Sequence, residues 1–270
     1  MAYSEEIFLW LSIALYSFSF LLFLGGLVFR KEAFQAYAFR VSVLAVLFHT
    51  GAMLARWAET GHLPVMGTYE NSIAGSWFMA VTYIIFRYVF PPSKPFGVAV
   101  MPLALLILGN GLQAEAVLQP LEPPYRSNWL YIHVLFAWFA FGAYAMALGA
   151  GALYLLKGWR QKGVLGRLPE LKLLDELSLR LILFGFFAEA IMIGSGAIWA
   201  HGLWGRYWGW DPVETWSLIS WLTYGVNIHL RVTMGWSGKR AAWLAIGSLF
   251  GIIFTFFGIG YVSELHTAIF

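Results

Sequence analysis

Eight long apolar runs constrain this chain more than any other feature of its sequence. Each approaches the roughly 20 mostly apolar residues that cross the hydrocarbon core of a membrane. The runs cover residues 7–29, 41–57, 73–90, 96–111, 129–156, 180–200, 213–230 and 241–262. Because an unpaired backbone is too costly in lipid and no barrel-like alternation repeats, we predict helices. Only 11% of the residues are charged, against roughly 25% in soluble domains. The sequence therefore predicts an all-α, polytopic transmembrane bundle with about eight spans.

The positions of the basic residues predict the orientation of the bundle. Of the 17 lysines and arginines, all but Arg56, Arg126 and Arg206 fall in or beside the first, third, fifth and seventh connections between spans. By the positive-inside rule, these connections are cytoplasmic and both termini lie on the outer side. The net charge of +3 thus follows from topology and gives no support to a nucleic-acid partner.

We expect residues 1–270 to form a single integral membrane domain that retains its first helix. The longest cytoplasmic connection, residues 157–179, carries regularly spaced leucines between Leu168 and Leu179, with Pro169 near the start. This pattern predicts a short amphipathic helix lying at the inner surface. The chain contains no cysteine, which excludes disulfides, thiolate ligands and a Cys-x-x-Cys-His site of its own.

The most informative segment is a tryptophan-rich loop on the outer side, residues 201–216. Its tryptophans and glycines alternate over a short stretch, namely Trp204, Gly205, Trp208, Gly209, Trp210 and Trp216. An interfacial aromatic belt is the simplest interpretation, and Asp211, Pro212 and Glu214 form the pattern of a helix N-terminus. Neither interpretation accounts for indole rings that are spaced by glycines. Such rings offer flat apolar faces to a planar ligand.

This segment matches the tryptophan-rich WWD signature of haem-handling proteins in cytochrome c biogenesis. The matching residues are Trp204, Gly205, Trp208, Trp210, Asp211, Glu214 and Trp216. As a whole, the chain resembles the CcsA (ResC-type) component of the System II cytochrome c synthase. Further matching elements are Gly61-His62-x-Pro64, Tyr69-Glu70, His133, His229-Leu-Arg231 and Ser263-Glu-Leu-His266. The resemblance runs from the second span to the C-terminus and implies that the tryptophan-rich loop binds haem.

The resemblance also assigns three histidines to haem iron. The family uses one external histidine before the tryptophan-rich loop and one after it, which correspond to His133 and His266 here. His229 ends the seventh span, about 27 Å below the outer loop at 1.5 Å per residue. In the family this position supplies one ligand of a second, transmembrane haem site, and the partner subunit supplies the other ligand.

A functional role is less strongly indicated for the remaining histidines. His49 lies in the middle of the second span, where ionisable residues are usually functional, but it can equally hydrogen-bond between helices. His62 and His201 fall in outer loops, where solvation alone explains a histidine. Glu189, in the middle of the sixth span, requires a neutral or paired state in lipid, and the sequence names no partner for it.

The resemblance implies that the chain carries haem b (iron protoporphyrin IX), bound non-covalently, across a bacterial cytoplasmic or thylakoid membrane. On the periplasmic or lumenal side it presents haem to the CxxCH thiols of apocytochrome c. The implied partners are a CcsB (ResB-type) membrane subunit and thiol-reducing proteins, and the haem lyase activity belongs to the complex. The alternatives are a System I-type haem exporter with fewer spans, a carrier of an unrelated small molecule, and a purely structural subunit.

Overall fold

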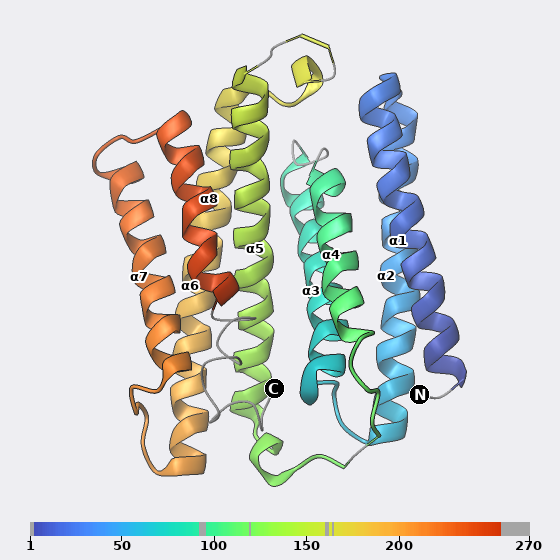
Figure 1. Cartoon of the computed structure of the whole chain (residues 1–270), viewed down its shortest axis with the longest axis vertical. Coiled ribbons are helices and arrows are strands. Elements are labelled where there is room, and N and C mark those ends of the chain that lie inside the picture. Colours follow the sequence, from blue (N-terminus) through green and yellow to red (C-terminus); the bar gives the residue numbers. More distant parts are fainter. Residues whose placement is uncertain (1–2, 92–95, 119, 160–161, 164, 255–270) are drawn as a thin grey trace. The chain divides into compact units, whose positions relative to one another are not determined.

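The computed structural model describes residues 3–91, 96–118, 120–159, 162–163 and 165–254, and the regular secondary structure of these residues is entirely helical, without a strand (Figure 1). The helices are α1 (Tyr3–Phe29), α2 (Glu32–Thr60), α3 (Gly67–Val89), α4 (Gly97–Gly111), α5 (Asn128–Trp159), α6 (Leu171–Trp204), α7 (Pro212–Val232) and α8 (Lys239–Ile253). Two short 3₁₀ helices, η2 (Pro123–Tyr125) and η3 (Leu165–Arg167), lie in the connections. Each predicted apolar run corresponds to one α-helix, so the predicted all-α membrane bundle is confirmed.

The helices differ in how well their own composition suits lipid. Helices α1, α2, α3, α5 and α6 are long and apolar enough to cross a membrane, and α4 is a shorter apolar helix. Helix α7 has only 21 residues, and the side chains that it buries are polar. Helix α8 is described only as far as Ile253.

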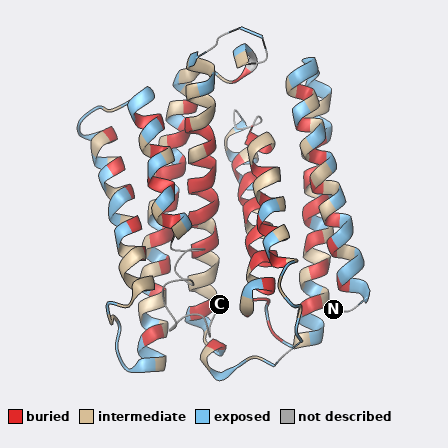
Figure 2. Cartoon of the chain, viewed as in Figure 1, coloured by how far each residue is buried: buried red, intermediate tan, exposed pale blue. Residues whose placement is uncertain are grey.

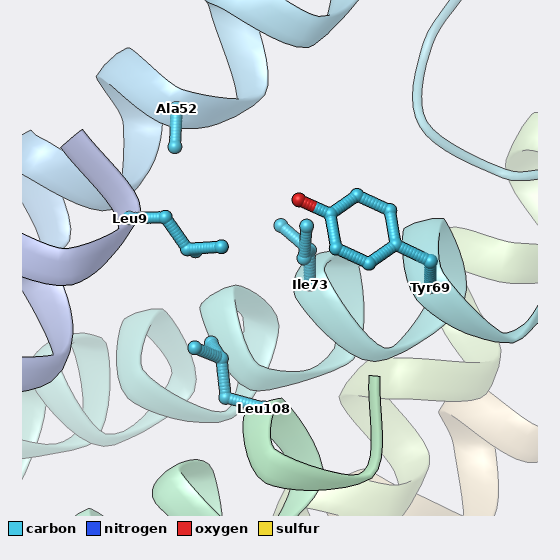
Figure 3. Close-up of a cluster of buried hydrophobic side chains, with 5 residues drawn as sticks. All are labelled: Leu9, Ala52, Tyr69, Ile73 and Leu108. Carbon is cyan, nitrogen blue, oxygen red and sulfur yellow. The ribbon is translucent and has the colours of Figure 1, made fainter. Parts of the chain in front are cut away.

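The predicted single domain is organised as two compact units, Met1–Tyr125 and Arg126–Phe270. In the first unit, α1 packs along α2 and α3 along α4, while α1 also contacts α4 and α2 contacts α3. A small apolar cluster joins these helices (Figure 3), formed by Leu9, Ala52, Tyr69, Ile73 and Leu108. The first unit is therefore a helical bundle with its own core.

A buried group of charged side chains lies beside this core. The Arg56 Nε donates to Glu70 Oε1 at 2.8 Å, and Arg56 Nη1 lies 3.7 Å from Glu5 Oε2. The other Glu70 oxygen accepts from the backbone N–H groups of Val65 and Met66, at 3.0 and 2.9 Å. Glu70 therefore joins the end of α2 to the start of α3.

The segment after α4 folds back onto this charged group. An Arg56 amino group donates to the Val117 carbonyl, and Tyr125 in η2 is buried nearby. Burial first, and then the carboxylates of Glu122 and Glu70, raise the pKa of Tyr125 to about 12. Tyr125 therefore stays neutral, and the charged group holds one long loop as well as three helices, α1, α2 and α3.

In the second unit, α5 packs along α6, α8 lies against α5, and α7 contacts both α6 and α8 (Figures 1 and 2). The segment predicted as a separate amphipathic helix between Leu168 and Leu179 is instead continuous with α6, which runs unbroken from Leu171 to Trp204. The reason is that Leu174 and Leu177 are buried on the same helix face as the following span, so no break is needed.

Arg56→Ala is expected to lower the free energy of unfolding by about 3–5 kcal/mol, because it leaves two buried carboxylates without their cation. The matched control is Lys172→Ala. Lys172 forms an exposed ion pair with Glu176 at 4.0 Å, and such pairs contribute less than about 1 kcal/mol. Denaturant unfolding of the detergent-solubilised protein measures both changes. Equal losses in the two variants would contradict the central role of Arg56.

Candidate functional site

The tryptophan-rich loop begins where α6 ends. Gly205 follows Trp204, the last helical residue, with a φ of 69°, and its N–H donates to the His201 carbonyl at 2.9 Å. This left-handed backbone region strains residues that carry a Cβ, and glycine adopts it freely. Gly205 is therefore the residue that lets the chain leave the helix.

The loop ends at a capping box that begins α7. Asp211 Oδ1 accepts from the Glu214 N–H at 2.9 Å, and Glu214 Oε2 faces the Asp211 N–H at 3.4 Å, with Pro212 as the first helical residue. The predicted helix start is confirmed. The same Glu214 oxygen also accepts from the Gly209 N–H at 2.6 Å, a contact that no sequence pattern indicates. Glu214 therefore holds the loop as well as the helix.

Trp210 is held in an uncommon backbone conformation. Its φ is 58°, in a region that bulky residues rarely adopt. Such a conformation costs about 1–3 kcal/mol and persists where neighbouring contacts impose it. Here the Glu214 carboxylate binds the N–H groups on both sides, those of Gly209 and Asp211. The loop thus presents the Trp210 ring, 69% exposed, to the surroundings.

A small pocket of about 70 Å³ opens beside this loop, within the second unit. Its wall combines His133 from α5, one face of α6, the loop and the first turn of α7. From the predicted loop residues, the wall includes Trp204, Trp208, Asp211 and Glu214. This volume is below the roughly 300–1,000 Å³ of ordinary small-molecule sites.

One ring nitrogen of His133 is hydrogen-bonded within the protein. Its Nδ1 lies 2.8 Å from the Met192 carbonyl oxygen, and since a carbonyl only accepts, Nδ1 carries the proton. In the neutral ring, Nε2 then keeps its lone pair, which is the arrangement typical of a metal-binding histidine. Gly196 on α6 makes room for this contact, because a Cβ there would lie 2.7 Å from Nδ1.

Aromatic rings surround this imidazole. The Trp199 ring lies 6.2 Å from that of His133, and Tyr207 stacks on His201 at 4.2 Å and 16°. The indole N–H of Trp208 is buried without a hydrogen-bond partner. An unpaired buried donor costs about 1–3 kcal/mol, so the wall contains a polar group that an acceptor on a ligand would satisfy.

Other predicted residues lie outside the pocket wall. Trp216 packs against Phe254, with ring centroids 4.5 Å apart. His229 is exposed near the opposite end of α7. His266 lies outside the described residues. Of the two predicted iron ligands that the structure describes, it brings His133 to the tryptophan-rich loop and leaves His229 near the far end of α7.

The remaining histidines are not part of this pocket. His49 is fully buried in α2, and its Nδ1 lies 3.2 Å from the Tyr16 hydroxyl. His62 is buried, and its Nδ1 donates to the Leu63 carbonyl at 2.8 Å. The solvated position predicted for His62 is therefore wrong. Glu70 holds the loop inward, because its carboxylate accepts from the backbone N–H groups of Val65 and Met66, which follow His62.

The chemistry of the pocket wall fits a flat, largely apolar ligand with a metal at its centre. Over the part of the chain that the structure describes, no group of three or more His, Cys, Asp or Glu side chains is placed to hold a metal ion. A single neutral imidazole among indole faces suits iron that a macrocycle already holds. The unpaired Trp208 N–H suits a polar group on the rim of the same ligand.

Known proteins share the sequence pattern and the fold of this chain. Residues 5–266 match the cytochrome c assembly protein family. The CcsA cytochrome c biogenesis protein of Parasynechococcus marenigrum (strain WH8102) is 33% identical over 83% of each chain, and that of Synechococcus sp. (strain CC9605) is 30% identical over 95% of each. The solved structure of the cytochrome c heme lyase CcmF superposes with a TM-score of 0.68 at 16% identity, over 98% of this chain and 49% of that one. The predicted resemblance is thus confirmed: the chain belongs to the cytochrome c assembly protein family and, within it, to the CcsA proteins of cytochrome c biogenesis.

Proposed function

We propose that this chain holds haem in the pocket beside its tryptophan-rich loop and presents it for thioether attachment to apocytochrome c. The observation that carries the proposal is the His133 imidazole, which lies among indole rings with Nδ1 bound to the Met192 carbonyl at 2.8 Å. Its Nε2 is thereby prepared to bind iron. Membership of the CcsA proteins supports the same function.

The bound species would be haem b, held without covalent attachment because the chain has no cysteine. Trp204 and Trp208 offer the apolar faces. The Arg206 guanidinium lies against the backbone of Gly209, beside the pocket, and is suited to pair with a propionate. The buried Trp208 N–H is a second donor for a carboxylate.

The second external iron ligand would be His266, as the family resemblance implies. His133 and His266, as neutral imidazoles, would hold the iron. When a CxxCH segment approaches, each thiol sulfur bonds to a vinyl carbon and its hydrogen passes to the adjacent carbon. This chain would supply binding and orientation, and the haem and the thiols would supply the covalent chemistry.

His229 would belong to a separate, inner haem site. Its side chain is exposed on α7, on the same face as Leu222 and Val226, which are also exposed. An exposed imidazole at membrane depth is costly unless another chain covers it. We therefore propose that a CcsB (ResB-type) subunit supplies the other ligand, and that haem moves from this inner site to the pocket on the periplasmic or lumenal side.

Combining His133→Ala with His266→Ala is expected to abolish the haem Soret band of the purified chain. Gly196→Ala should weaken the band without removing a ligand, because the new methyl group displaces the His133 imidazole. Gly194→Ala is the matched control, since a Cβ there meets no atom within 4 Å. Imidazole added to the double variant should restore the band if the fold is intact. A Soret band that survives both histidine substitutions would exclude the external site.

His229→Ala is expected to lower the haem content of the complex co-purified with its partner subunit, because one ligand of the inner site is lost. Val226→Ala, one turn earlier on the same exposed face, should leave haem content unchanged. Pyridine haemochrome spectra normalised to protein measure both. Equal haem in the wild type and the His229 variant would count against an inner site.

A further inference from the structure

The connection between α7 and α8 is a well-defined loop, at the end of α7 opposite to the tryptophan-rich loop (Figure 1). Gly235 has a φ of 67°, and the next N–H, that of Trp236, donates to the Leu230 carbonyl at 3.0 Å. This arrangement is a common way to end a helix. Further along, the Gly238 N–H donates to an Asp175 carboxylate oxygen of α6 at 3.3 Å. The loop is therefore fixed near both of its ends.

An open pocket of about 370 Å³ lies on this loop. The volume is within the roughly 300–1,000 Å³ of ordinary small-molecule sites. Six residues line the pocket, two of them basic and none of them acidic, and we call their site the basic pocket. They are Met234, Gly235, Trp236, Ser237, Lys239 and Arg240. Two cationic side chains therefore border one space that can admit a ligand.

The carboxylate that contacts the loop does not neutralise these two cations. Asp175 already pairs with Arg231, whose Nη2 lies 2.9 Å from Asp175 Oδ1. Lys239 and Arg240 are both exposed, and the Arg240 guanidinium lies 5.7 Å from the centre of the Trp236 ring. Such a contact with an aromatic face orients a cation without cancelling its charge. The basic pocket therefore presents two positive charges to a ligand.

The position of the two cations in α8 also favours an anion. Lys239 and Arg240 are its first two residues, and the start of a helix carries unpaired N–H groups and a partial positive charge. The N-cap residue Gly238 has no side chain to cap these groups, and the first turn contains no acidic residue. The positive-inside rule explains basic residues in this connection, but not their place at a helix start. An anion bound here would offset both unfavourable features.

The surroundings of the basic pocket indicate the source of the anion. Three large apolar side chains near it are exposed, Val232 by 64%, Met234 by 60% and Trp243 by 63%. Trp243 follows Lys239 by one turn, on the same face of α8. Indole rings at the end of a membrane helix suit the headgroup level of the bilayer. A free phosphate ion would leave these apolar side chains without a partner, whereas the acyl chains of a lipid would cover them.

We infer that the basic pocket binds the phosphate group of an anionic phospholipid. The Lys239 ammonium and the Arg240 guanidinium pair with phosphate oxygens, and the Ser237 hydroxyl donates a further hydrogen bond. The seventh connection is predicted to be cytoplasmic, so the lipid belongs to the inner leaflet, where anionic lipids bind basic pockets of membrane proteins. The bound lipid holds the ends of α7 and α8 at the membrane surface. This inference is independent of the proposed haem site.

Native mass spectrometry of the purified full-length chain, titrated with phosphatidylglycerol in detergent, measures the Kd of the tightest-bound lipid. Lys239→Gln combined with Arg240→Gln is expected to raise this Kd about thirtyfold, because each basic residue near a membrane surface strengthens binding about fivefold. Both side chains are exposed, so the double variant should fold as the wild type does. Phosphatidylcholine, whose ammonium group cancels its phosphate charge, should bind the wild type much more weakly.

The matched control combines Lys31→Gln with Arg40→Gln. These are again one lysine and one arginine, both exposed, in or beside a connection that is predicted to be cytoplasmic. Each also lies over an aromatic ring, at 5.5 Å from Phe34 and 5.7 Å from Tyr37. This variant removes the same charge and should bind phosphatidylglycerol as the wild type does. An equal rise in Kd in the two double variants would overturn the inference, because total charge would then explain the binding.

Hydrogen–deuterium exchange locates the bound lipid. Phosphatidylglycerol is expected to slow amide exchange in residues 233–243 of the wild type and to have no such effect in the variant that lacks Lys239 and Arg240. Unchanged exchange in the wild type, or equal Kd values for phosphatidylglycerol and phosphatidylcholine, would overturn the inference. Displacement of the lipid by an equal concentration of inorganic phosphate would also overturn it, because the ligand would then be a free anion.

Discussion

The site depends most on the hydrogen bonds that Glu214 makes. One oxygen accepts from Gly209 and faces the Asp211 N–H, and the backbone N–H of Glu214 donates to the Asp211 side chain. These contacts fix the tryptophan-rich loop against the first turn of α7 and hold Trp210 in its uncommon conformation. Helix α7 begins at these contacts, and its rotation about its own axis determines where its polar residues point.

That rotation connects the pocket with the interior of the bundle. Because Ser217 follows Glu214 by one turn, the face that begins in the pocket wall continues inward toward Glu189. The opposite face carries His229, which is exposed and which we propose a partner subunit covers. Helix α7 therefore carries on one face the polar groups that are buried within this chain, and on the opposite face His229, which is proposed to act between two chains.

Most of the fold could be predicted from the sequence because apolar length and the Asp-Pro-Val-Glu cap are local signals. The spacing of the polar residues on α7 is also legible in the sequence, from Ser217 to Arg231. The pairing of His133 with Met192 and of Glu189 with Tyr144 could not be predicted, because each joins different helices. The continuity of α6 through Leu171–Leu179 was missed because an amphipathic pattern looks the same in a surface helix and in the first turns of a span.

The most direct test of the central claim compares the haem content of the purified wild-type chain with that of a variant whose pocket is filled. The account predicts equimolar haem in the wild-type chain and its loss in Ala197→Trp, because Ala197 lines the pocket. Leu222→Trp, which adds the same indole on an exposed face of α7, should bind haem as the wild type does. A chain that binds no haem, or binds equal amounts in Ala197→Trp and the wild type, would contradict the account.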